Sequence, residues 1–231
     1  FILYEPAERA GVLQELGVEY LKLDDKRIVA LYTPNQSFFL TMAYQAESLK
    51  EAGLWEDHPN RFLIMTTASS EVWREWAKRQ GIAVVAVPVG FKEIAAMERK
   101  IEAQMAAGKA VRVWDAFGQE INLGKDPRLL FAGEESGGMI TGPEELIQSE
   151  GGRRAIAMRE KSAGEALVIQ AALAAHLESK GQYLSDYLKS EFDRNDIQMR
   201  FDVREDVAYY DQNNPDPQAL TDEAVLKLIP D

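Results

Sequence analysis

Apolar and polar residues follow two patterns along this chain: short continuous apolar runs, and longer segments with apolar residues at helical spacing. The short runs predict strands at residues 1–4, 28–32, 62–65, 82–87, 111–117 and 129–131. The helical segments cover residues 8–16, about 34–50, 71–80, 94–105, 163–179 and 185–192. Because the two kinds of segment alternate, the pattern predicts an α/β fold.

Several residues refine these elements. Ser70 is expected to cap the helix that follows it, and Ser185 to cap the short helix that ends at Phe192. The run at residues 82–87 is rich in valine, as expected of a strand covered on both faces. Residues 163–179 are apolar almost all round, which predicts a helix packed on the sheet.

Composition narrows the class of protein. The chain has 231 residues, enough for one large domain or two small ones, and a net charge of −12. That charge argues against nucleic acid or an anionic membrane as a partner. There are no cysteines, which excludes disulfides and thiolate metal sites and is compatible with the cytoplasm, where we expect the protein to lie. The chain begins at Phe1 within a predicted strand, so we expect a fragment of a longer protein.

The most informative segment is the acidic loop, residues 133–138, directly after the strand that ends at Phe131. Glu134 and Glu135 offer acceptor oxygens, Ser136 offers a donor and an acceptor, and Gly137 lets backbone approach a ligand. Ligands of α/β sheets bind beyond the carboxyl ends of the strands. The loop therefore indicates a polyhydroxylated ligand, with an acidic solvated turn as the alternative.

Two cationic segments complement this loop. Gly90 and Lys92 follow an apolar strand at the start of a helix, where N–H groups favour an anion. Arg159 and Lys161 precede the helix at residues 163–179. Either segment alone is compatible with a solvated charge. Together with the acidic loop they predict a sugar-phosphate site, because one end of such a ligand needs acceptors and the other needs cations.

Other chemistry-bearing residues point to no second site. His58 and His176 have no serine and carboxylate arranged with them as a triad. Asp24 and Asp25 are neighbours, and neighbouring strand residues point to opposite faces, so a surface turn is the better interpretation.

The order of these motifs is distinctive. Thr66-Thr-Ala-Ser-Ser70, Val89-Gly-Phe-Lys92, Gly133-Glu-Glu-Ser-Gly137 and Arg159-Glu-Lys161 follow one another along the chain. In this order they resemble the third domain of the α-D-phosphohexomutases, the phosphoglucomutases and phosphomannomutases, over residues 1–192. The resemblance implies a three-layer mixed sheet with helices on both faces. Residues 193–231 would be a linker or the start of a following module.

The resemblance also implies residue roles. Glu134 and Ser136 would grip sugar hydroxyls, with Glu135 at the variable position of the loop and Gly137 closing it. Gly90 and Lys92 would lie beside the bound sugar phosphate, and Lys161 matches a phosphate contact of some members. Members of the family move a phosphate between two positions of a hexose through a bisphosphate intermediate.

Some family motifs are missing from this chain. It has no Ser-His-Asn catalytic loop, no three-aspartate metal loop and no Arg-x-Ser-x-Thr clamp. We therefore expect no catalytic residue here and no turnover by the chain alone. The Mg²⁺ of the whole enzyme would bind outside this chain, with a hexose 1,6-bisphosphate as activator or intermediate. Ser162 and Gly138 stand where members carry Asp and His, so the resemblance leaves the hexose open.

The expected partners are a hexose phosphate and the other domains of the parent chain, with no nucleic acid and no membrane. The alternative function is a non-catalytic α/β module that binds a sugar phosphate or another protein.

Overall fold

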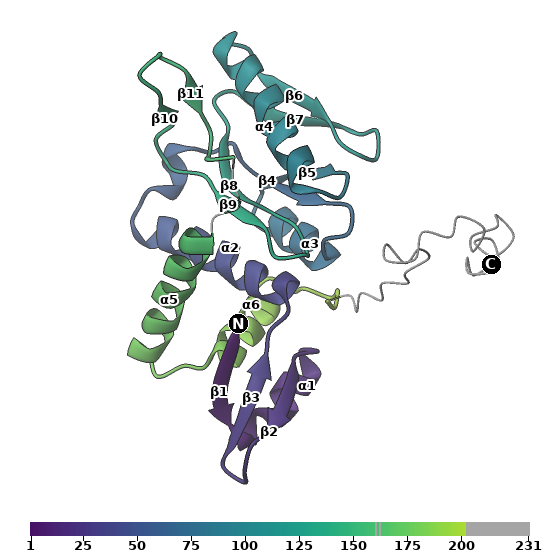
Figure 1. Ribbon diagram of the computed structural model, residues 1–231, viewed down its shortest axis with the longest axis vertical. Helices are drawn as coiled ribbons and strands as arrows, with labels where there is room; N and C mark the ends of the chain where they lie inside the picture. Colours follow the sequence, from purple (N-terminus) through teal and green to yellow (C-terminus); the bar gives the residue numbers. More distant parts are fainter. Residues whose placement is uncertain (160, 162, 202–231) are drawn as a thin grey trace, which may run out of the picture. The chain divides into compact units, whose positions relative to one another are not determined.

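The continuous apolar runs form the central sheet. In the computed structural model, which describes residues 1–159, 161 and 163–201, this sheet has the strand order β5-β4-β8-β9 (Figure 1). Strand β4 (Arg61–Thr66) is parallel to both β5 (Ala83–Val87) and β8 (Arg128–Gly133), and β8 is antiparallel to β9 (Met139–Thr141). The sheet is therefore mixed, as predicted.

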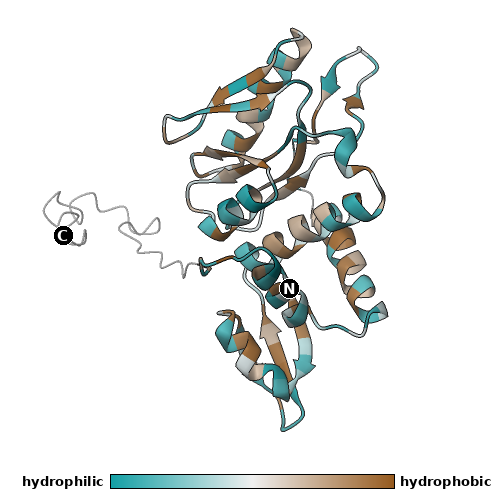
Figure 2. Cartoon of the chain, turned by 180° about the vertical axis from the view of Figure 1, so that it is seen from behind, coloured by the Kyte–Doolittle hydropathy of each residue, from teal (hydrophilic) through white to brown (hydrophobic). Residues whose placement is uncertain are grey.

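Alternation along β4 sends its side chains to two separate cores. Phe62 and Ile64 pack with helix α4 (Phe91–Ala106), whereas Leu63 and Met65 belong to the core that includes α2 (Pro34–Glu51) and α3 (Glu71–Arg79). The sheet strands are hydrophobic over most of their length (Figure 2). Helices thus cover both faces, which confirms the predicted three-layer fold.

Local sequence signals explain where the helices of one layer begin. Helix α2 starts with a capping box, in which Thr33 and Gln36 exchange side-chain and backbone hydrogen bonds, and Pro34 occupies the first turn. The Ser70 hydroxyl accepts from the Val72 N–H at 3.4 Å, so the predicted cap of α3 is confirmed.

Smaller elements surround the sheet. Strands β1, β3 and β2 form a separate antiparallel sheet, and two hairpins are made by β6 with β7 and by β10 with β11. Asp24 accepts hydrogen bonds from the N–H groups of Lys26 and Arg27, which makes the expected surface turn. The bounds of these elements and of the remaining short helices are β1 Ile2–Pro6, η1 Ala7–Arg9, α1 Ala10–Glu15, β2 Glu19–Lys22, β3 Arg27–Leu31, η2 Trp55–Asp57, β6 Val111–Trp114, β7 Glu120–Gly124, β10 Ile147–Gln148 and β11 Arg154–Ala155.

Helix α5 (Ala163–Ser179) packs on the sheet as predicted, but with only part of its apolar surface. It contacts strand β9, but it also packs on α2 and on α6 (Leu184–Arg194), and of its own residues only Leu173 and Leu177 are buried. Leu167 and Val168 are 68% and 67% exposed. The predicted packing of this helix on the sheet is thus confirmed by its contact with β9, while part of its apolar surface stays exposed.

Ser185 was placed wrongly. Helix α6 (Leu184–Arg194) begins one residue earlier, with Tyr183 as its N-cap. Ser185 lies within the first turn and is fully buried, and its hydroxyl donates to Glu5 of β1 instead of capping the helix. The local pattern predicted that the Ser185 hydroxyl caps the helix, but it binds Glu5, which is 180 residues away in the sequence.

Glu5 connects the small sheet to α6. Its carboxylate is 3% exposed and accepts from the Tyr32 hydroxyl at 2.8 Å and the Ser185 N–H at 3.2 Å, as well as from the Ser185 hydroxyl. Burial, followed by the adjacent Glu5 charge, raises the pKa of Tyr32. A buried carboxylate is tolerated here because its lone pairs are satisfied.

Packing continues past Phe192. Helix α6 ends at Arg194, Ile197 is buried, and the ring of Phe201 lies 5.6 Å from that of Phe192. Most of the predicted linker or following module, from residue 202 onward, lies outside the described residues, so that prediction stays untested. Within the described part of the chain, no helix combines the length and apolarity that crossing a bilayer requires.

The Glu5 network predicts a large effect of Glu5→Ala. The substitution leaves three buried donors without their acceptor, so the free energy of unfolding should fall by about 2–4 kcal/mol. Urea denaturation measures this change. The control Glu8→Ala, at an exposed position nearby, should change it by less than about 0.5 kcal/mol. Equal losses in both variants would contradict the assigned role of Glu5.

Candidate sugar-phosphate site

Three parallel strands end at the same edge of the central sheet. Strand β4 ends at Thr66, β5 at Val87 and β8 at Gly133, and Thr66 pairs with Val87 while Met65 pairs with Gly133. The loops after these strands are the segments that the sequence singled out. The fold thus brings them together at the edge where α/β sheets bind ligands.

The acidic loop is a hairpin turn between β8 and β9. The Glu134 N–H donates to the Gly138 carbonyl at 2.9 Å, and the Gly137 N–H donates to the Glu134 carbonyl at 3.1 Å. Gly137 has φ of +102°, a conformation that favours glycine. Strand β8 carries an irregularity at Leu130, since Phe62 pairs with Leu129 and Leu63 with Phe131.

Glu134 is paired with one of the predicted cations. The side chain of Glu134 is 4% exposed, and its carboxylate forms an ion pair with the ammonium group of Lys161. The same ammonium group lies 5.3 Å from the centre of the Phe91 ring, at the start of α4. The structure therefore brings Glu134, Lys161 and the beginning of α4 together.

Glu135 faces the sheet. It is buried, and its Oε2 accepts from the Thr66 hydroxyl at 2.8 Å, which in turn lies 3.0 Å from the Ser69 hydroxyl. Ser136 and Gly137 are exposed at the tip of the turn. The loop thus divides into a buried acidic base and an exposed tip.

Gly90 and Lys92 flank the same place. Gly90 is the N-cap of α4, with φ of +125°. The side chain of Lys92 is 85% exposed, and its ammonium group lies 3.9 Å from Glu93. The backbone of Lys92 therefore lies at this edge, next to Phe91 in the first turn of α4. Its side chain, however, extends into solvent and not toward the acidic loop.

Gly138 makes this packing feasible. A Cβ atom at this position would lie 2.8 Å from Cε of Lys161, and 2.9 Å from both Oε1 of Glu134 and Cδ2 of Phe91. These distances are shorter than van der Waals contact. Residue 138 must be small for the three side chains to meet as they do.

Arg159 does not join Lys161. It forms an ion pair with Glu102, and its Nε lies 3.8 Å from the buried Glu98. Burial raises the pKa of Glu98 to about 8, although the charge of Arg99 acts in the opposite direction. Neither carboxylate oxygen of Glu98 has a hydrogen-bond partner among the described residues. The cationic pair of the sequence is thus split between two places.

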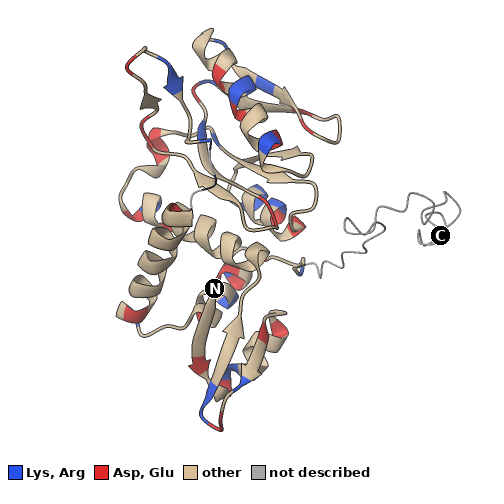
Figure 3. Cartoon of the chain, viewed as in Figure 1, with Lys and Arg blue, Asp and Glu red and all other residues tan. Residues whose placement is uncertain are grey.

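Arg159 instead lines a cavity of about 570 Å³ between α4 and the β10–β11 hairpin. Basic and acidic residues lie side by side on these elements (Figure 3). The cavity is lined by Arg99, Glu102, Ala103, Met105, Ala106, Asp126, Leu146, Gly152, Arg153, Arg154, Ile156 and Arg159. None of the predicted sugar-contacting residues is among them, so this cavity is not the predicted site.

A match to a protein-family model identifies the kind of domain to which this sheet belongs. The model described as phosphoglucomutase/phosphomannomutase, alpha/beta/alpha domain III, matches residues 34–195. The chain belongs to this family. The matched residues of this phosphohexomutase domain include the acidic loop and the segments with Gly90 and Lys161.

Comparisons with solved structures and with curated proteins do not extend this assignment. A crystal structure of a protein provisionally assigned as a phosphomannomutase, from Thermus thermophilus, aligns with 18% identity and a TM-score of 0.38. The alignment covers 83% of this chain and 36% of that protein, so the chain spans about a third of its length. No curated protein sequence matches the chain.

Sequence reasoning did not predict the contacts that three residues make at this edge. Phe91 provides the ring beneath Lys161, Thr66 holds Glu135, and Gly138 leaves the space that they need. Each lies inside or next to a motif already singled out, but their contacts cross between loops that are distant in sequence.

We expect Gly138→Ala to disturb the site. The added methyl group must displace Lys161, Glu134 or Phe91, and should lower the free energy of unfolding by about 1–3 kcal/mol. Thermal and urea unfolding measure this. The control is Gly164→Ala in α5, where a Cβ meets nothing within 4 Å and the change should be neutral or slightly stabilising. A neutral Gly138→Ala would show that the three side chains are not closely packed.

Proposed function

We propose that this chain is the sugar-binding domain of a phosphohexomutase, an enzyme that transfers phosphate within a hexose phosphate through a bisphosphate intermediate. The observation that carries the proposal is the pairing of Glu134 with Lys161 beside the start of α4. This pairing supports the proposal because it brings an acceptor and a cation together at the edge of the sheet where ligands of α/β proteins commonly bind.

In this proposal the acceptors read the sugar. The carboxylate of Glu134 and the hydroxyl of Ser136 would take hydrogen bonds from hexose hydroxyls, with Glu135 fixed behind them by Thr66. Glu134 is held by a partner that a ligand can displace, because the side chain of Lys161 is half exposed. Gly137 gives the exposed tip of the turn its shape.

The cations would hold the phosphate. When sugar hydroxyls donate to Glu134 in place of Lys161, the ammonium group of Lys161 would bind a phosphate oxygen instead. The Phe91 ring would keep that ammonium group near the start of α4. Lys92, extended into solvent after Gly90, offers a second cation at the same helix entrance. One hexose phosphate would thus replace the internal ion pair with contacts at both of its ends.

The remaining chemistry would come from outside this chain. The phosphorylated serine, the loop that binds Mg²⁺ and the hexose 1,6-bisphosphate intermediate belong to the whole mutase that the family implies. Contact with other domains of such a protein would cover the exposed Leu167 and Val168 of α5. The cytoplasm, where hexose phosphates are metabolised, remains the proposed location.

Glu134→Gln in the complete mutase tests the proposal. The substitution removes the charge that strengthens hydrogen bonds from sugar hydroxyls, so kcat/KM for glucose 1-phosphate or mannose 1-phosphate should fall by about 10²-fold. A coupled assay of hexose 6-phosphate formation measures it. The control Glu145→Gln, an exposed carboxylate elsewhere, should leave the rate unchanged. Unchanged kinetics in a folded Glu134→Gln enzyme would refute the proposal.

The isolated chain should bind glucose 1-phosphate weakly or undetectably, because it supplies only one side of the site. Titration followed by tryptophan emission measures this binding. Tight binding, abolished by Glu134→Gln, would favour the alternative, a non-catalytic module that binds a sugar phosphate by itself.

A further inference from the structure

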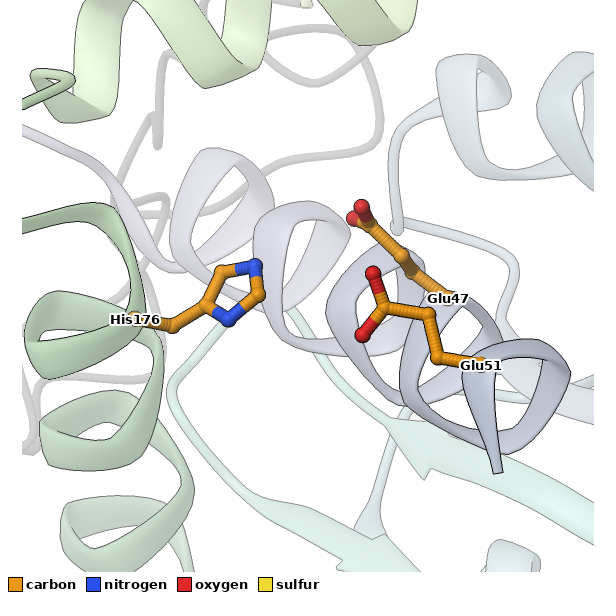
Figure 4. A group of neighbouring side chains, drawn as sticks. All are labelled: Glu47, Glu51 and His176. Atoms are coloured by element: carbon orange, nitrogen blue, oxygen red, sulfur yellow. The ribbon is translucent and has the colours of Figure 1, made fainter. Parts of the chain in front are cut away.

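A second cluster of chemistry-bearing side chains lies where α2 meets α5. Glu47 and Glu51 are one helical turn apart on α2, and His176 faces them from α5 (Figure 4). One ligand atom from each of the three residues lies within 4.8 Å of the other two. The cluster is near the end of α2, away from Asn35, whose contact with Ser70 marks the sugar-phosphate edge.

The imidazole of His176 has an unused nitrogen. Its Nε2 atom is buried and has no hydrogen-bond partner among the described residues. A buried polar nitrogen without a partner is costly, so a ligand for it would stabilise the fold. The ring of Tyr44, 5.3 Å from the imidazole ring, packs against it and limits its rotation.

One carboxylate is already oriented. Oε2 of Glu47 accepts from the Tyr187 hydroxyl of α6 at 2.8 Å. Metal-binding carboxylates commonly have such a supporting hydrogen bond, which fixes the side chain and leaves the other oxygen for the metal.

The two carboxylates also attract a cation. The ammonium group of Lys180 lies 3.7 Å from Oε1 of Glu47 and 3.9 Å from Oε1 of Glu51. Both distances exceed a normal hydrogen bond, and the Lys180 side chain is 42% exposed. Lys180 thus balances part of the acidic charge without hydrogen bonding to either carboxylate.

We propose that Glu47, Glu51 and His176 form a zinc site that joins α2 to α5. An imidazole nitrogen with two carboxylate oxygens suits Zn²⁺, which takes three protein ligands and a water molecule, with bonds of about 2.0–2.2 Å. Mg²⁺ prefers oxygen ligands alone, so it fits the set poorly. The three ligand atoms lie within 4.8 Å of one another, so the two glutamate side chains would rotate toward the imidazole on binding the metal. This site is independent of the proposed sugar-phosphate binding.

The test uses the full chain after chelator treatment. Titration calorimetry should show one Zn²⁺ per chain, and at free zinc 100-fold above Kd the Tm should rise by about 5–10 °C. The same concentration of Mg²⁺ should produce no comparable shift. X-ray absorption at the zinc edge should show a first shell of nitrogen and oxygen only, at about 2.0–2.2 Å.

Variants locate the site. Glu51→Gln and His176→Gln should each weaken zinc binding at least about 10-fold, and Glu51→Gln keeps the fold testable because that side chain is 56% exposed. His58→Gln, which alters the other histidine of the chain, is the matched control and should bind zinc as the parent does. Lys180→Gln should tighten binding, since it removes the competing cation.

Two results would overturn the proposal. One is the absence of a zinc-dependent rise in Tm in the parent chain. The other is equal zinc affinity in the parent, Glu51→Gln and His176→Gln, which would place the metal elsewhere. Neither result bears on the sugar-phosphate site, whose test is the kinetics of Glu134→Gln.

Discussion

The parallel pairing of β4 with both β5 and β8 is the constraint on which the rest of this domain depends. Parallel strands must be covered on both faces, and the alternation along β4 supplies two apolar faces for α4 on one side and for α2 and α3 on the other. Because the three strands run in the same direction, their carboxyl ends share one edge. Every residue proposed to contact the sugar phosphate lies in, or packs on, a loop at that edge.

Much of this arrangement could be predicted from local pattern. The strands at residues 62–65 and 82–87, the Ser70 cap and the α/β class follow from apolar runs, a hydroxyl at a helix start and alternation of elements, and all agree with the structure. The family resemblance rested on the order of four short motifs, and the match over residues 34–195 confirms it. The roles of the individual site residues remain a proposal.

Long-range contacts are what the sequence could not reveal. Ser185 has a side chain suited to a helix cap, but its hydroxyl donates a hydrogen bond to Glu5, 180 residues away in the sequence. Arg159 and Lys161 are two residues apart, yet Glu102 attracts the first and Glu134 the second. Local pattern identifies which side chains can ionise or donate, whereas packing decides which partner each one reaches.

The irregularity at Leu130 decides which face of the sheet each residue between it and the acidic loop occupies. Leu130 and Phe131 both belong to the core that contains α2 and α3, because the extra residue interrupts the alternation of β8. All side chains after that point are consequently shifted to the opposite face from the one that regular alternation would assign. Loss of Leu130 alone would restore regular pairing and leave Glu134 and Glu135 in their present surroundings, because Leu129 and Phe131 already face opposite cores. Regular pairing of the unshortened strand would instead turn every residue after Leu130 to the other face, so the strand's length and its irregularity must change together if the acidic loop is to keep its contacts.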